Sequence, residues 1–212
     1  MNSVFHAAAG AGLGALVLGP EAAPAELALC AVAGTSPDWD AVLLLIDKPI
    51  FLRFHRGLTH GFAGLALAAL LAGGVLALWG GWDFARGAGL WLLAAGGHSA
   101  SDLFNRSGVS LLAPFSKRRT RFPAVSWGDI PLTLGASAVA LWAFLWPESG
   151  RLAAALGLGG YALYLRRRLR APLLQNAVSR WWFRRVCRFA PPPVETSPAP
   201  AVLSRELGKE AR

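Results

Sequence analysis

The chain has 212 residues, of which 54% are hydrophobic and only 16% are charged, and its mean hydropathy is +0.43. This composition excludes an ordinary soluble domain of the same length and predicts a membrane protein. The formal net charge of +9 is then interpreted as a consequence of membrane topology and attraction to anionic lipid, with no specific nucleic-acid partner. Two cysteines without a CxxC spacing indicate neither a disulfide nor a thiolate metal site.

Apolar segments in chain order predict six helices, at residues 4–18, 25–34, 61–79, 87–98, 130–146 and 152–165. The third and fifth carry no charge and approach the roughly 20 residues needed to cross the hydrocarbon core. The first two are rich in Ala and Gly, which favours close packing against neighbouring helices. The first, second and fourth are marginal as spans. The predicted fold is an all-α polytopic membrane bundle of about six helices.

Basic residues fix the expected orientation of this bundle. If the helices alternate in direction, 19 of the 21 Lys and Arg residues fall on one side of the membrane, and only Arg86 and Arg151 fall on the other. The positive-inside rule makes the basic side cytoplasmic. We therefore expect a multi-pass protein of a bacterial inner membrane with both termini in the cytoplasm.

Three regions follow from the distribution of charge and proline. Residues 1–165 form the predicted transmembrane bundle. Residues 166–189 combine arginines with an apolar face, which predicts a basic juxtamembrane helix lying on the inner leaflet and holding anionic phospholipid head groups. Residues 190–212 are rich in Pro, Ala and Ser, and we expect a disordered tail.

All four histidines and several aspartates lie at the predicted cytoplasmic helix ends. Ionisable groups at the edge of a bilayer are costly and are rarely kept without a role. Imidazole and carboxylate together are ligands of zinc, manganese and iron. Seven candidates exceed the three or four ligands of one catalytic zinc, so one or two ions are expected. The candidate ligands are His6, Asp38, Asp40, His55, His60, His98 and Asp102.

The local context of these residues gives further expectations. His98 and Asp102 are four residues apart and share one face of a helix. Thr59 is a plausible N-cap of the third helix. Ser101 and Asn105 could hydrogen-bond to metal ligands, and Asp129 is expected to be a carboxylate at a helix N-terminus rather than a ligand. Taken singly, a pair such as His98 and Asp102 is also typical of a structural hydrogen bond between packed helices.

Met1 to about Asp129 resembles a known family. The order of an early His, Ser36-Pro37-Asp38-x-Asp40, His55-Arg56-Gly57-x-Thr59-His60 and His98-x-x-x-Asp102 is similar to that of the YdjM-like, LexA-regulated, membrane-bound metal-dependent hydrolases of bacteria. That family is distantly similar to helical zinc-dependent phospholipase C and nuclease folds. The resemblance implies phosphoester hydrolysis and makes these seven His and Asp residues the metal and catalytic set.

The leading functional hypothesis is a hydrolase acting on a phospholipid or lipid-linked phosphate at the inner leaflet. Asp40 or Asp38 would accept a proton from water, and Arg56 would steady negative charge on phosphate oxygens. Zinc is the expected metal, with manganese and iron as alternatives. A metal transporter or metal sensor is the main alternative, although transporters place ligands near the membrane midplane. A scaffold with a lipid-binding tail leaves the histidines unexplained. The sequence gives no oligomeric state.

Overall fold

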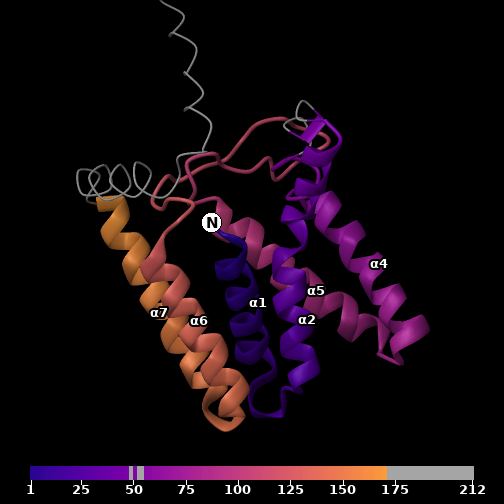
Figure 1. Ribbon diagram of the computed structural model, residues 1–212, viewed down its shortest axis with the longest axis vertical. Coiled ribbons are helices and arrows are strands. Elements are labelled where there is room, and N and C mark those ends of the chain that lie inside the picture. Colours follow the sequence, from indigo (N-terminus) through magenta and orange to yellow (C-terminus); the bar gives the residue numbers. More distant parts are fainter. Residues whose placement is uncertain (48–49, 52–54, 171–212) are drawn as a thin grey trace, which may run out of the picture. The chain divides into compact units, whose positions relative to one another are not determined.

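The protein is described by a computed structural model that covers residues 1–47, 50–51 and 55–170. Across these residues it contains six α-helices and two 3₁₀ helices, and Figure 1 shows them as an all-helical assembly. The predicted all-α fold is confirmed. The predicted interfacial helix at residues 166–189 is described only as far as Arg170, and its first five residues continue the last α-helix of the bundle instead of starting a separate one. The rest of it and the predicted disordered tail lie outside the described residues.

The first two helices form a tightly packed hairpin. Helix α1 (Ser3–Leu18) begins at Asn2, whose side chain accepts from the Phe5 amide, and the 3₁₀ helix η1 (Gly19–Glu21) turns the chain into α2 (Pro24–Thr35). Gly10 of α1 lies so close to the Cys30 carbonyl of α2 that an added Cβ would be 2.2 Å from its oxygen. Small residues at this crossing therefore bring the two backbones together, as the Ala- and Gly-rich composition predicted.

The third and fourth apolar segments form a second hairpin. Helices α4 (Phe62–Gly80) and α5 (Phe84–Asp102) are joined at Gly81, which has a φ of 67° and ends α4 in the left-handed conformation that glycine tolerates best. At the α4–α5 turn end of the bundle, the Arg86 guanidinium forms an ion pair with the buried Glu26 carboxylate, which ties α5 to α2.

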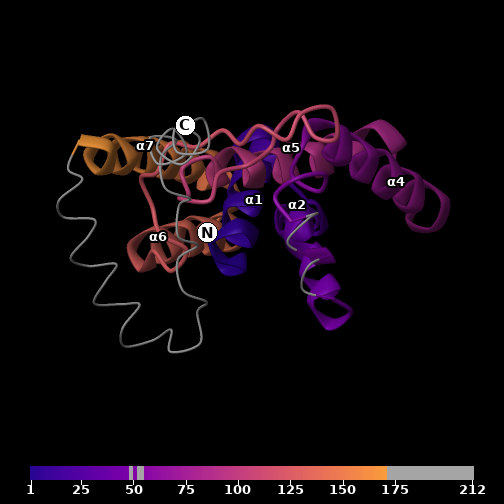
Figure 2. The ribbon, with the colours of Figure 1, turned by 90° about the horizontal axis from the view of Figure 1, so that it is seen from above.

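The last hairpin packs on α1. Helix α6 (Ile130–Leu145) begins at Asp129, and α7 (Pro147–Arg170) returns antiparallel to it, as Figures 1 and 2 show. The Asp129 carboxylate accepts from the Leu132 amide, from the Tyr164 hydroxyl and from Arg168. These contacts join the start of α6 to the end of α7.

Three helical stretches are long and apolar enough to cross a membrane, namely Ser3–Glu21, Pro24–Leu45 and Phe62–Gly80. Helix α6 is a shorter apolar helix. Large apolar side chains such as Leu78 and Leu134 are 77% and 65% exposed, which suits surfaces that face lipid rather than water. The fold is therefore that of a membrane bundle.

Candidate metal centre

Four separate segments bring polar side chains to one end of the bundle. His6 lies in the first turns of α1, and His98 and Asp102 lie in the last turns of α5. Asp38 belongs to the 3₁₀ helix η2 (Ser36–Leu45), which continues directly from α2, and His60 precedes α4. Two helix starts and two helix ends thus meet, as the expected alternation of the helices requires.

Two groups of side chains have a geometry that could hold a metal ion, and they share His98. The first consists of His6, His98 and Asp102, and the second of Asp38, His60 and His98. In each group, one ligand atom per residue lies within 4.8 Å of the others. His6, His60, His98 and Asp102 are at most 3% exposed, and Asp38 is partly exposed at the rim.

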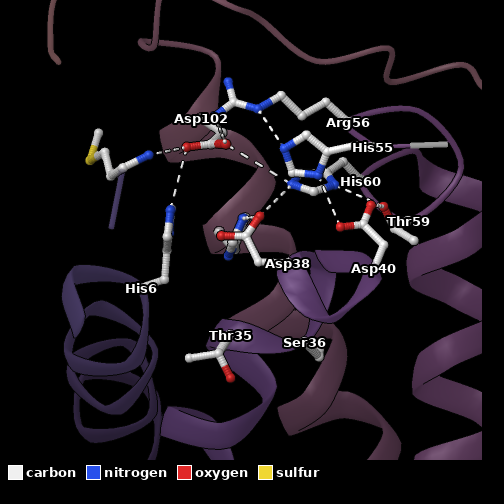
Figure 3. A network of polar contacts seen from close by, with 12 residues as sticks. His6, Thr35, Ser36, Asp38, Asp40, His55, Arg56, Thr59, His60 and Asp102 are labelled. Atoms are coloured by element: carbon white, nitrogen blue, oxygen red, sulfur yellow. Dashed lines mark hydrogen bonds and ion pairs between the residues drawn. The ribbon is translucent and has the colours of Figure 1, made fainter. Parts of the chain in front are cut away.

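Separations between the ligand atoms match those around a metal. Ligands about 2.0–2.1 Å from one tetrahedral zinc lie about 3.3 Å from each other. The Asp38 Oδ1 atom is 3.4 Å from His60 Nε2 and 3.6 Å from His98 Nε2. The His6 Nε2 atom is 3.4 Å from Asp102 Oδ1. Figure 3 shows His6 approaching Asp102 from α1, with Asp38 and His60 on the other side of the cluster.

Three imidazole nitrogens face this centre without a hydrogen bond. The Nε2 atoms of His6, His60 and His98, together with Asp102 Oδ2, are buried and have no hydrogen-bond partner within the described part of the chain. Buried polar atoms are normally paired, since an unpaired one costs about 1–3 kcal/mol. A cation in either ligand group would satisfy some of these atoms, so the residues present fit one or two bound divalent metal ions.

The other ring nitrogen of His98 is held by the backbone. His98 Nδ1 lies 2.7 Å from the Gly34 carbonyl oxygen, which can only accept, so Nδ1 carries the proton. The Nε2 lone pair is then left for a metal, in the arrangement usual for metal-binding histidines. Nothing in the sequence around Gly34 marks this carbonyl, because its role depends only on how α2 crosses α5.

Hydroxyl groups hold the other two histidines in the same tautomer. The Thr59 hydroxyl donates to Asp40 Oδ2 at 2.8 Å and is 3.0 Å from His60 Nδ1, from which it accepts. The Ser101 hydroxyl donates to the His98 carbonyl oxygen and lies 3.4 Å from His6 Nδ1. Burial also lowers the pKa of His60, which lies outside the candidate spans, and this favours the neutral imidazole that binds metal.

Asp40 and His55 form a second layer beside the ligand groups. The Asp40 carboxylate is 2.9 Å from His55 Nδ1 and also accepts from Thr59, so both of its oxygens are engaged within the protein. His55 Nε2 accepts from Arg56 Nε at 3.3 Å. The structure therefore brings all seven predicted residues together, but only five of them lie in the two groups that could hold a metal.

Arg56 lies against the centre in an unusual backbone conformation. Its φ of 59° is in the left-handed region, which is costly for a residue with a side chain and is often found at functional sites. Its carbonyl oxygen accepts from the Ser110 amide at 2.9 Å, and its Nη2 atom is 3.5 Å from Asp102 Oδ2. The buried Nη1 atom has no hydrogen-bond partner among the described residues, so it can still donate to a ligand.

Several neighbouring residues differ from their expected roles. The N-cap of α4 is Gly61 and not Thr59, because the Thr59 side chain turns to Asp40 instead, so that expectation was wrong. Asn105 is buried nearby, but its carbonyl oxygen accepts from the Arg106 amide and not from a ligand. The Met1 amino group donates to Asp102 Oδ1 at 2.6 Å, a contact that sequence reasoning missed.

Fold and site together define a helical membrane protein with a buried histidine–aspartate cluster at one end of its bundle. The chain belongs to the YdjM inner membrane protein family, which matches residues 1–171 and hence the whole cluster. It is also similar to the uncharacterized protein YfhP of Bacillus subtilis (strain 168), with 29% identity over 153 residues. This match covers 67% of the chain and 46% of YfhP, so the chain spans less than half the length of that relative. No solved structure matches the chain.

Proposed function

We propose that the protein is a membrane-embedded, metal-dependent hydrolase that acts on a phosphoester at the cytoplasmic leaflet. The observation that carries this proposal is the set of three buried Nε2 atoms and a carboxylate oxygen that have no hydrogen bonds among the described residues and belong to two adjoining ligand groups that share His98. Ordinary helix packing does not require such a set. Zinc is the metal that the ligand types and separations favour.

A divalent metal held by His6, Asp38, His60, His98 and Asp102 would polarise a phosphoryl oxygen and lower the pKa of a water molecule. Arg56 has a role that does not depend on metal ligation. Its guanidinium lies beside Asp102, and its Nη1 atom is buried without a partner among the residues described. It is placed to donate to a phosphate oxygen and to stabilise the charge that develops there.

The Asp40–His55 pair is suited to moving a proton. Asp40 accepts from His55 Nδ1 and thereby holds the imidazole in one tautomer, as the carboxylate does in hydrolytic triads. The Nε2 atom, which accepts from Arg56 Nε at 3.3 Å, would be the one to take a proton once Arg56 turns to the substrate. Asp40, expected from the sequence to be the base itself, would instead position His55, whose side chain is 21% exposed at the rim of the centre.

An anionic substrate is favoured by the segment that follows α5. The Phe62 amide donates to the Leu111 carbonyl, and the Ser110 amide donates to that of Arg56, so this segment is attached to the loop of the site. It carries exposed cations at residues 117–119. Such a cluster attracts phosphorylated head groups at the surface of the inner leaflet.

The test combines metal content with turnover. Full-length protein purified in detergent should contain about one or two equivalents of zinc, and zinc should be required to hydrolyse phosphodiester and lipid phosphate substrates. His60→Ala and Asp102→Ala should lose both metal and activity. Asp83→Asn is the matched control, because Asp83 caps α5 at its other end and Asn keeps an acceptor there.

Each other outcome counts against the proposal in a defined way. Hydrolysis that persists in both Ala variants would exclude this mechanism. Metal-loaded protein that hydrolyses no phosphoester, but moves zinc into liposomes, would replace the hydrolase by a transporter.

A further inference from the structure

A second feature of the bundle is an apolar groove that the metal centre does not use. It is formed by α1, α5, α6 and α7 and has a volume of about 670 Å³, within the usual range of about 300–1,000 Å³ for small-molecule sites. Its polar wall residues include Ser101, Tyr161 and Tyr164. The hydroxyls of Ser101 and Tyr164 donate to protein acceptors, whereas the buried Tyr161 hydroxyl has no partner among the described residues. The groove therefore offers its occupant mainly hydrocarbon contacts.

The groove has the length of one lipid chain. Along α1 it runs from Phe5 to Leu16, eleven residues apart, which is about 16 Å at 1.5 Å per residue. This is close to half of the hydrocarbon core, which is about 30 Å thick. The end of the groove at Phe5 lies next to the metal centre. Phe5 directly precedes His6, and Ser101 both lines the groove and contacts His6. The groove is thus long enough to span the hydrocarbon of one leaflet, the leaflet next to the metal centre.

Glycines keep the groove open on the side of α6 and α7. Gly135 and Gly160 both line it and are exposed, and a Cβ added to either would meet no atom within 4 Å. Inside the hydrocarbon core there is no water to fill such a space. A void leaves its wall atoms without partners for dispersion contacts, so hydrocarbon must occupy it.

Basic side chains near the end of the groove next to the metal centre favour an anionic lipid. Tyr164 lines the groove, and Arg166 and Arg167 follow it within one turn of α7 and are exposed. A phosphate at the head of a chain lying in the groove would be at the level of these guanidinium groups.

We infer that this groove is a binding site for one acyl chain of an anionic phospholipid from the leaflet next to the metal centre. The chain lies along α1 between α5 and the α6–α7 hairpin. The head group lies at the depth of Arg166 and Arg167, on the side of α7 toward Arg167. This binding does not depend on whether the protein is a hydrolase.

The test uses a phosphatidylglycerol with a photoreactive diazirine in its acyl chain, in liposomes that contain the full-length protein. After irradiation, mass spectrometry locates the labelled peptides. Labelling should be concentrated on the groove walls of α1, α6 and α7. Gly135→Leu and Gly160→Leu should each lower this labelling about tenfold, because their side chains fill the space. Gly89→Leu is the matched control, since Gly89 is an exposed helical glycine with equally open surroundings that does not line the groove.

Three results would overturn the inference. The first is labelling spread evenly over the outward faces of α4 and the groove walls. The second is equal loss of labelling in the Gly89 control and in the two groove variants, when thermal melting shows all three folded. The third is protein–protein crosslinking through the groove, which would make a second copy the occupant. Metal content, measured in parallel, distinguishes failure here from failure of the hydrolase proposal.

Discussion

Thr59 lies outside the two candidate ligand groups, but its contacts predict an effect on the proposed metal binding. Its hydroxyl donates to Asp40 and accepts from His60, and this leaves His60 Nε2 free to face the centre. Thr59→Val keeps the shape of the side chain but removes this connection. We expect zinc affinity to fall about 10- to 100-fold, as is typical when a partner of a metal ligand is lost.

Zinc titration with a competing chelator measures this change. Thr35→Val is the control, because the Thr35 hydroxyl contacts the Val32 carbonyl and Trp39 Nε1 but no candidate ligand and, as Figure 3 shows, lies away from the cluster. Equal zinc affinity in wild-type protein and Thr59→Val would show that Thr59 does not hold His60.

A substitution of His55 can test the proposed proton transfer without removing a candidate metal ligand. It contacts Asp40 and Arg56 but belongs to neither ligand group. His55→Gln should therefore retain zinc while kcat falls about 10²- to 10⁴-fold, the usual contribution of a general acid or base. The measurements are zinc per protein and turnover of a phosphodiester. Loss of zinc along with activity would instead make His55 a ligand.

At the scale of elements, the crossing of α1 and α2 determines whether the two halves of the site meet. An added Cβ on Gly10 would be 2.2 Å from the Cys30 carbonyl oxygen, a backbone atom that cannot move alone. Gly10→Ala should push the helices apart and lower the free energy of unfolding by about 1–3 kcal/mol, the usual cost of overpacking. His6 and His98 would then separate, and zinc affinity should fall.

Thermal melting in detergent and zinc titration measure both effects. Gly89→Ala is the control, because its added Cβ meets nothing within 4 Å and alanine favours a helix over glycine. A Gly10→Ala variant as stable as Gly89→Ala would show that close approach of α1 and α2 is not needed.

At the scale of the whole molecule, the cytoplasmic position of the site is a prediction from charge. In a variant without Cys30 and Cys187, a cysteine at Phe84 should react with a membrane-impermeant maleimide added outside intact spheroplasts. A cysteine at Lys117 should react only after the membrane is opened, since the positive-inside rule puts its segment in the cytoplasm. Labelling of both positions from outside would reverse or break this topology.

Much of the fold follows from the sequence because lipid imposes simple rules. Apolar segments without charges must be helices, since every backbone group must be paired within its own segment. Four of the six predicted segments accordingly lie within α1, α2, α5 and α7, and the other two exceed α4 and α6 by one residue each. The candidate ligands could also be found from the sequence, because a histidine or aspartate at the edge of a bilayer is too costly to be incidental.

Which partners each of these residues contacts was decided only by the tertiary structure. Asp38 and Asp40 are two positions apart in η2, yet one faces His60 and His98 while the other faces His55 and Thr59. The Gly34 carbonyl that holds His98 has no signal in the sequence, since any residue carries such a carbonyl. The groove beside the centre likewise exists only where four helices meet. Composition and spacing determine which segments cross the membrane and which end of each is polar, whereas the direction of a side chain depends on how helices far apart in sequence cross.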